Sequence, residues 1–254
     1  MKNNRNILCV VEGEKTELKI LAELDNKFIG ENFIFFPFGT NIYQVYHRYI
    51  NEVSEIGEEI DMFIFLKSFD QQGILKDKLK RDFRAIYLFV DLDGHDPLAN
   101  RYLECLPKML SIFDNETENG KLYVSYPMVE SFKHPIQQAE TSEILKGRKY
   151  KEHVAKICDT RINQFSNNNL DKAEWSKILI QHVKVINFLV NDNFSYPTLH
   201  QDAIQMFSQK LIYENQCVKF ITPSMIVVVL SPFAMFLLEL LGEPLFEEWQ
   251  KIAN

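Results

Sequence analysis

Three acidic residues each follow an apolar run that has the character of a buried strand. Glu12 comes directly after residues 7–11, and Asp91 and Asp93 come after residues 85–90. Open α/β sheets place their functional groups at the carboxyl ends of their strands. If the two strands are neighbours, the three carboxylates meet at one edge, where they repel one another unless a hard divalent cation binds them. The pattern therefore predicts a site for Mg²⁺ or Mn²⁺.

The alternative interpretation is that these acids are solvated residues at strand ends and helix starts, where Asp and Glu offset the helix dipole. We favour the metal site for Glu12, Asp91 and Asp93, because all three end apolar strands. For Glu14 the helix-start interpretation is the better one. Glu130 follows a further expected strand. It is a catalytic candidate at the same sheet edge, and a helix-start role fits it equally well.

Strand-like and helix-like segments alternate through the first half of the chain. Short apolar runs predict the strands, and apolar residues at helical spacing predict the helices between them. The resulting β-α-β-α-β-α-β order predicts an α/β fold, with a parallel sheet flanked by helices. We expect strands at 6–11, 33–38, 84–91 and 121–126, and helices at 14–28, around 42–50 and around 97–113.

Some segments of this half have less distinct patterns. Residues 61–70 fit either a strand or a buried helical turn, and residues 71–84 are predicted to be helical and basic. Pro107 falls inside an expected helix and should kink or split it, because proline removes a helix hydrogen bond and clashes with the preceding turn.

The pattern changes after residue 135. We expect a domain of residues 1–135 that carries the acids, followed by a mostly helical region of residues 136–254. In this region we expect amphipathic helices at 174–190 and 199–213, a strand at 226–230 and a helix from Pro232.

The apolar stretch 225–241 is the one candidate for a membrane span. It contains Ser231 and Pro232 in its middle and Glu239 near its end. A strand followed by a buried helix explains these residues better than a span, so we expect no membrane association.

Composition indicates an ordinary globular protein. The 254 residues include 28 basic and 35 acidic side chains, for a net charge of −7. Net acidity argues against broad coating of nucleic acid but allows a local basic groove. The four cysteines are far apart and form no CxxC pair, which argues against a zinc knuckle or a disulfide framework. We therefore expect a cytoplasmic protein, and no signal peptide is visible.

Two basic runs could guide a nucleic-acid backbone. A solvated charged face is the more common explanation of such a run. The first run comprises Lys76, Lys78, Lys80, Arg81 and Arg84, and the second comprises Lys146, Arg148, Lys149 and Lys151.

The two acidic motifs together resemble the topoisomerase–primase (TOPRIM) domain. These motifs are Val-Glu-Gly-Glu-Lys-Thr-Glu at 11–17 and Val-Asp-Leu-Asp-Gly at 90–94. The chain is most similar to the stand-alone bacterial nucleases related to the overcoming-lysogenisation-defect nucleases and to small TOPRIM proteins of phage-defence loci. The resemblance covers roughly residues 6–135, in line with the expected α/β sheet. The distance between the motifs is somewhat long, so residues 51–82 are a candidate insertion.

The resemblance implies a role for each acid. Glu12 matches the acid of metal binding and acid/base catalysis, and Asp91 and Asp93 match the paired aspartates that hold Mg²⁺. Glu17 matches a second metal-site acid one helical turn beyond Gly13. The glycine itself matches the one that lets the chain turn without a side chain in the site.

The implied function is a Mg²⁺-dependent nuclease that cleaves DNA or RNA, in defence against phage. No tyrosine stands in a topoisomerase motif and no primase-type zinc module is present, which disfavours both of those activities. No Walker motif is present either, so an ATPase partner, which many relatives have, would be separately encoded. The leading alternative is a non-catalytic TOPRIM-fold subunit that binds nucleic acid or that ATPase. A third hypothesis is another phosphotransfer or hydrolysis reaction at the same metal site.

Overall fold

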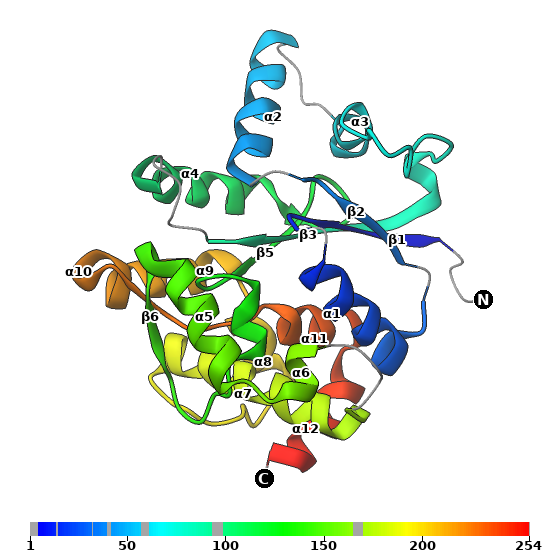
Figure 1. Ribbon diagram of the computed structural model, residues 1–254. Helices are drawn as coiled ribbons and strands as arrows, with labels where there is room; N and C mark the ends of the chain where they lie inside the picture. Colours follow the sequence, from blue (N-terminus) through cyan, green and yellow to red (C-terminus); the bar gives the residue numbers. More distant parts are fainter. Residues whose placement is uncertain are drawn as a thin grey trace. The chain divides into compact units, whose positions relative to one another are not determined.

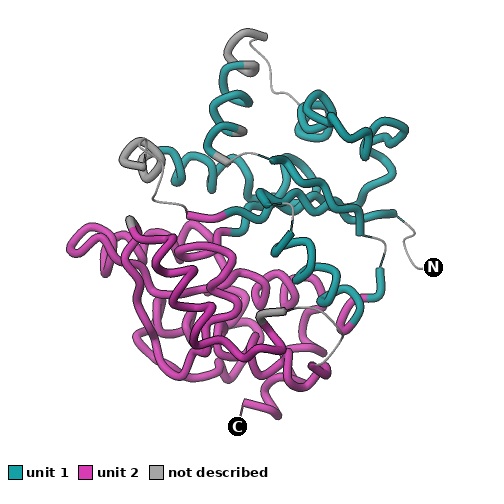
Figure 2. Tube along the Cα trace, viewed as in Figure 1, with its two compact units in different colours: residues 1–26, 30–90, 102–123 teal, residues 27–29, 91–101, 124–254 magenta. Residues whose placement is uncertain are grey.

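The computed structural model divides the chain into two compact units, which are coloured separately in Figure 2. Unit 1 comprises residues 1–26, 30–90 and 102–123, and unit 2 comprises residues 27–29, 91–101 and 124–254. The predicted division of the chain at residue 135 stays a prediction. The structure describes residues 5–13, 15–31, 33–39, 42–56, 61–92, 99–164 and 170–253.

A five-stranded, mostly parallel sheet confirms the predicted α/β class. Its strand order is β2-β1-β3-β5-β4. Strand β1 pairs in parallel with both β2 and β3, and β4 pairs antiparallel with β5. The side chains of β1 and β3 are almost all buried, as expected for parallel strands covered on both faces. The strands are β1 (Asn6–Val11), β2 (Phe33–Pro37), β3 (Phe83–Asp91), β4 (Asp114–Asn115) and β5 (Gly120–Ser125).

The helices of this part of the chain lie on both faces of the sheet. Figure 1 shows α1 on one face and α2, α3 and α4 on the other. Right-handed crossovers explain this, because the chain moves from β1 to β2 in one direction and then back past β1 to β3 in the other. The strand order therefore reverses between β1 and β3. The helices are α1 (Thr16–Leu24), α2 (Ile42–Ile56), α3 (Met62–Ser68) and α4 (Ala99–Ile112), and a π-helical turn, η1 (Asp25–Ile29), follows α1.

The segment between α3 and β3 corrects one prediction and settles another. Residues 61–70 contain helix α3, which Asp61 caps by accepting hydrogen bonds from the N–H groups of Phe63 and Ile64. Residues 71–84 are not a helix. They form turns and one short 3₁₀ helix, η2 (Lys80–Asp82), and the last two of them already belong to β3. Gly73 has a left-handed φ of +72°, and the Asp70 carboxylate accepts the N–H groups of the two residues that follow Gly73. These local side-chain bonds replace the helical ladder.

Pro107 was predicted to kink or split its helix. Helix α4 is not split, since it runs as one element from Ala99 to Ile112 with Pro107 inside it, and the kink stays a prediction. The Pro107 side chain is exposed, so its ring does not pack in the core.

Unit 2 is mostly helical, as predicted. Its helices are α5 (Gly147–Ile157), α6 (Thr160–Gln164), α7 (Lys172–Asn191), α8 (His200–Met206), α9 (Gln209–Gln216), α10 (Thr222–Ser224), α11 (Phe233–Leu241) and α12 (Glu243–Ala253). The shorter helical turns are η3 (Val129–Lys133), η4 (Ile144–Lys146) and η5 (Cys217–Ile221). Strands β6 (Thr141–Glu143) and β7 (Ile226–Val228) form a small antiparallel sheet.

Helix α7 confirms the predicted helix at 174–190, and the strand-then-helix reading of residues 225–241 is confirmed by β7 and α11. The expected helix at 199–213 is two helices, because Ser208 interrupts it and caps α9 through the N–H of Leu211. Across the part of the chain that the structure describes, no helix is long and apolar enough to cross a bilayer.

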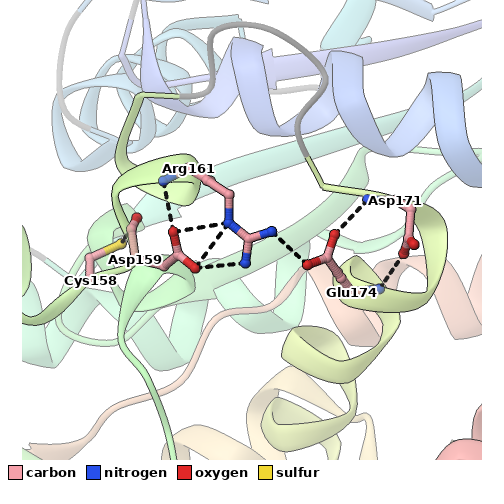
Figure 3. Close-up of polar contacts among 5 residues, drawn as sticks. All are labelled: Cys158, Asp159, Arg161, Asp171 and Glu174. Atoms are coloured by element: carbon pink, nitrogen blue, oxygen red, sulfur yellow. Dashed lines mark hydrogen bonds and ion pairs between the residues drawn. The ribbon is translucent and has the colours of Figure 1, made fainter.

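A polar network ties α6 to the start of α7 (Figure 3). The Arg161 guanidinium pairs with Asp159 at 2.9 Å and with Glu174 at 2.7 Å. Asp171 and Glu174 form a reciprocal capping box at the first turn of α7. Hydrogen bonds from the Asp171 N–H and from Arg161 lower the pKa of Glu174, because they favour its ionised form.

Candidate functional site

The turn after β1 carries Glu12 and is held by Glu17. Glu12 follows the last residue of β1 and is half-buried. Glu17 lies in the first turn of α1 with only 6% of its surface exposed, and its Oε1 accepts the N–H of Gly13 at 3.3 Å. A Cβ on Gly13 would lie 2.7 Å from the other oxygen of that carboxylate. The absence of a side chain at Gly13 therefore allows the Glu17 carboxylate to lie close to the backbone there. Through this contact Glu17 orients the turn that carries Glu12.

The second predicted acid, Asp91, ends β3. Val11 pairs with Phe89 in the parallel register of β1 and β3. By this register the chain reaches Glu12 one residue after Val11 and Asp91 two residues after Phe89, at the same edge of the sheet. The strand arrangement that was predicted from the two apolar runs is confirmed. Asp91 is half-buried, and the next residue, Leu92, donates its N–H to the Ser125 carbonyl at 3.0 Å.

These acids flank the place where the strand order reverses. Ligands of open α/β sheets bind outside the carboxyl ends of the strands at such a switch point. Asp93 falls in residues 93–98, outside the described part of the chain. Among the residues that are described, no three acidic, histidine or cysteine side chains lie close enough together to hold a metal. The metal site stays a prediction that depends on Asp93.

Glu130 has a partner that the sequence did not indicate. It lies in η3, its side chain is only 6% exposed, and it forms an ion pair of 2.9 Å with Lys151 of α5. A buried carboxylate is costly without a countercharge, and the Lys151 ammonium supplies one. Lys151 belongs to the second predicted basic run, and here it balances an acid.

A hydrogen-bonded cluster that sequence reasoning missed lies near Glu130. His134 Nε2 lies 2.8 Å from Glu140 Oε2, and the Tyr150 hydroxyl lies 3.3 Å from His134 Nδ1. Burial, then the charges of Glu130 and Glu140, raise the pKa of Tyr150 above its ordinary value. The Tyr150 phenol therefore stays protonated at neutral pH. No motif spacing links these residues, and the contact of Tyr150 with His134 depends on how α5 packs against η3 and the residue that follows it.

Several residues of each basic run form ion pairs with acids. Ion pairs join Lys80 to Asp61 at 2.5 Å, Arg84 to Glu31, Lys146 to Glu143 at 2.6 Å, and Arg148 to Glu152 at 3.2 Å. Such partly exposed pairs add little stability, but they reduce the net positive charge that each run presents. Binding of nucleic acid by these runs stays a prediction.

Comparison with known proteins gives no family for this chain. No protein-family model, no curated protein and no solved structure matches it. The described geometry consequently supports the α/β class with a helical second unit, and the finer resemblance remains an expectation.

Proposed function

We propose that this protein is a metal-dependent nuclease that hydrolyses phosphodiester bonds of DNA or RNA. One observation carries the proposal. The two parallel strands that meet at the switch point, β1 and β3, run into Glu12 and Asp91 at the same sheet edge. Two carboxylates there, with Asp93 two residues further along the chain, are oxygen ligands of the kind that Mg²⁺ and Mn²⁺ prefer.

The proposal gives each acid a role. Asp91 and Asp93 would hold the ion, which when bound supplies positive charge to a phosphate oxygen and acidity to a bound water. Glu12 either shares in metal binding or takes the proton of the attacking water and returns it to the leaving oxygen. Glu17 acts on Glu12 through Gly13, since its carboxylate holds the turn. Glu130 keeps its proposed place as a further acid, with Lys151 balancing its charge.

The biological setting is also part of the proposal. By its resemblance to the phage-defence nucleases, we infer a role in defence against phage or other foreign DNA. We further infer a cytoplasmic location and an association with a separately encoded ATPase. The resemblance alone supports these three statements.

The test compares Glu12→Gln with Glu118→Gln. The first change removes the charge of the proposed catalytic acid at nearly constant size, and the second makes the same change at an exposed turn residue. Neutralising one electrostatic group of an active site typically costs about a hundredfold to a thousandfold in rate. We expect Glu12→Gln to lose cleavage of DNA or RNA by at least that factor, and Glu118→Gln to keep it. The assays contain Mg²⁺ or Mn²⁺, both nucleic acids, and any ATPase encoded beside the gene.

A metal titration tests metal binding by the site separately from cleavage. We expect calorimetry to detect Mn²⁺ binding by the native chain and a loss of that binding in Asp91→Ala and Asp93→Ala. Equal cleavage by the native chain and Glu12→Gln, together with unchanged metal binding in both aspartate variants, would reject the nuclease. The non-catalytic subunit would then be the better proposal.

A further inference from the structure

A cavity of about 400 Å³ lies within unit 1 at the carboxyl end of β2. We call it the β2 pocket. Its size falls within the usual range of small-molecule sites. Aromatic rings, one guanidinium group and several side-chain amides line it, chiefly Phe38, Gln44, Arg48, Phe69, Gln71 and Gln72. Neither the acidic motifs nor the basic runs of the sequence include these residues.

Arg48 and the two phenylalanines form a cation–aromatic platform in this pocket. The Arg48 guanidinium carbon lies 4.0 Å from the centre of the Phe69 ring. The Phe69 ring in turn lies 5.1 Å from that of Phe38, at an angle of 46°. Arg48 extends from α2 and is exposed. Its cation therefore lies over an aromatic face, and a planar guanidinium group can also stack against a second planar group.

The amides at the pocket rim are carried by a loop with defined geometry. Asp70 accepts the N–H groups of Ile74 and Leu75 at 2.9 Å and 2.5 Å. Gln71 donates its own N–H to the Phe69 carbonyl at 2.8 Å. These bonds fix the turn from which Gln71 and Gln72 project. A ligand that uses their side chains therefore pays little to order the backbone.

The pocket is also connected to the β1 turn. The N–H of Phe38 donates to the carbonyl of Val11 at 2.8 Å, and Val11 directly precedes Glu12. All of these residues belong to unit 1. The wall of the pocket and the proposed catalytic acid are thus attached to the same end of β1.

We propose that the β2 pocket binds one unpaired nucleobase together with its phosphate, as part of a single-stranded nucleic acid. The base would stack on the Arg48–Phe69 pair, and side-chain amides such as those of Gln71 and Gln72 would meet polar groups on the base edge. The N–H groups at the edge of the Arg48 guanidinium would bind the phosphate. The choice of a strand as the ligand rests on the proposed nuclease function, whereas recognition of a base and phosphate rests on the pocket alone.

The experiment measures binding without cleavage. The full-length Glu12→Gln chain is titrated, in EDTA and separately in Mg²⁺, with single-stranded DNA and RNA that carry fluorescent 2-aminopurine. Stacking quenches this base, so we expect quenching together with a rise in anisotropy. Adding Arg48→Gln or Phe69→Leu should weaken binding by roughly fivefold to a hundredfold and remove the quenching, because one stacked base contributes that much.

Controls separate the pocket from general charge and from folding. Lys108→Gln removes one exposed positive charge of unit 1 outside the pocket and should leave the quenching intact. Arg48 is exposed and Phe69→Leu keeps an apolar side chain, so the thermal midpoints of both variants should stay close to that of the parent chain. A matched duplex should bind without quenching, because its bases are paired.

A titration with a mononucleotide tests whether the ligand is part of a nucleic-acid strand or a free nucleotide. Tight binding of the single-stranded nucleic acid and weak binding of the mononucleotide, both sensitive to Arg48→Gln, would support the nucleic-acid strand as the ligand. If only the mononucleotide binds tightly, the proposal that the ligand is a single-stranded nucleic acid is overturned, and a free nucleotide is the ligand. If neither binds, or if folded Arg48→Gln and Phe69→Leu bind like the parent, the pocket proposal fails. Because no cleavage is measured, this failure is distinct from failure of the nuclease proposal.

Discussion

Gly13 and Glu17 show how two residues of a motif can depend on each other. Gly13 does not have a left-handed φ, so its backbone conformation is open to alanine. What excludes a side chain is the buried Glu17 carboxylate, whose nearer oxygen would lie 2.7 Å from a Cβ. A side chain at position 13 would therefore require the Glu17 carboxylate to move, and that carboxylate accepts the N–H of the same glycine.

This dependence predicts strong coupling in a double-mutant cycle. Gly13→Ala alone must displace a buried carboxylate, and Glu17→Ala alone removes a hydrogen bond to the turn, each at a cost of about 1–2 kcal/mol. Once Glu17 is alanine the added methyl group has space, so the double variant should lose about 1 kcal/mol less than the sum of the single losses. Thermal unfolding followed by circular dichroism measures the cycle. Additive losses would contradict the proposed contact.

At the scale of elements, the start of α7 combines two local interactions. Asp171 accepts the N–H of Glu174 at 2.8 Å, and the Glu174 carboxylate accepts the N–H of Asp171 at 3.0 Å. The Glu174 carboxylate also pairs with Arg161 (Figure 3). The capping box therefore both starts the long helix of unit 2 and fixes the position of α6.

Removal of this cap should destabilise unit 2. Asp171→Ala loses the side-chain acceptor of the capping box and should cost about 1 kcal/mol, whereas Asp171→Asn keeps a good acceptor and should cost only a few tenths. Both tryptophans, Trp175 and Trp249, are buried in unit 2, so their fluorescence during urea unfolding reports on this unit. Equal losses in the two variants would show that the cap does not stabilise the helix.

At the scale of the whole molecule, stability should depend on pH through His182. This residue is fully buried in α7, and its Nδ1 accepts the N–H of Ser231 at 3.1 Å. Burial, then the charge of His134, lowers the pKa of His182 from 6.5 to about 3. The folded protein thus keeps this ring neutral at a pH where the unfolded chain binds a proton.

The sign of the effect follows from that difference. The contribution of His182 to stability is fully present above pH 6.5 and is lost as the pH falls from there towards 3. While only the unfolded chain binds the proton, the loss approaches about 1.4 kcal/mol per pH unit. His182→Asn keeps an acceptor for Ser231 but does not titrate. The stability of this variant should therefore depend less on pH.

Urea unfolding followed by tryptophan fluorescence at several acidic pH values checks this prediction. His47→Asn, a change at an exposed histidine, is the matched control and should keep the native pH dependence. If His182→Asn loses stability on acidification as steeply as the native chain, another group is responsible for acid unfolding.

Sequence by itself determined the parallel strands of the sheet, the helical character of the second half and the edge at which Glu12 and Asp91 stand. These predictions were possible because they depend on local sequence. A short apolar run specifies a buried strand, and the acid that follows it marks the carboxyl end, where such sheets place their functional groups. It was wrong for residues 71–84, where side-chain bonds from Asp70 and the left-handed Gly73 override a charged, helix-like composition.

Only the tertiary structure decided which side chains meet. The Glu130–Lys151 pair joins η3 to α5, and the Arg48–Phe69 platform joins α2 to the residue that follows α3. These partners are separated by about twenty residues, and neither pair repeats at a helix or strand period. Their contacts depend on how the elements pack, and hydrophobic periodicity fixes the buried face of each element without fixing which neighbour covers it.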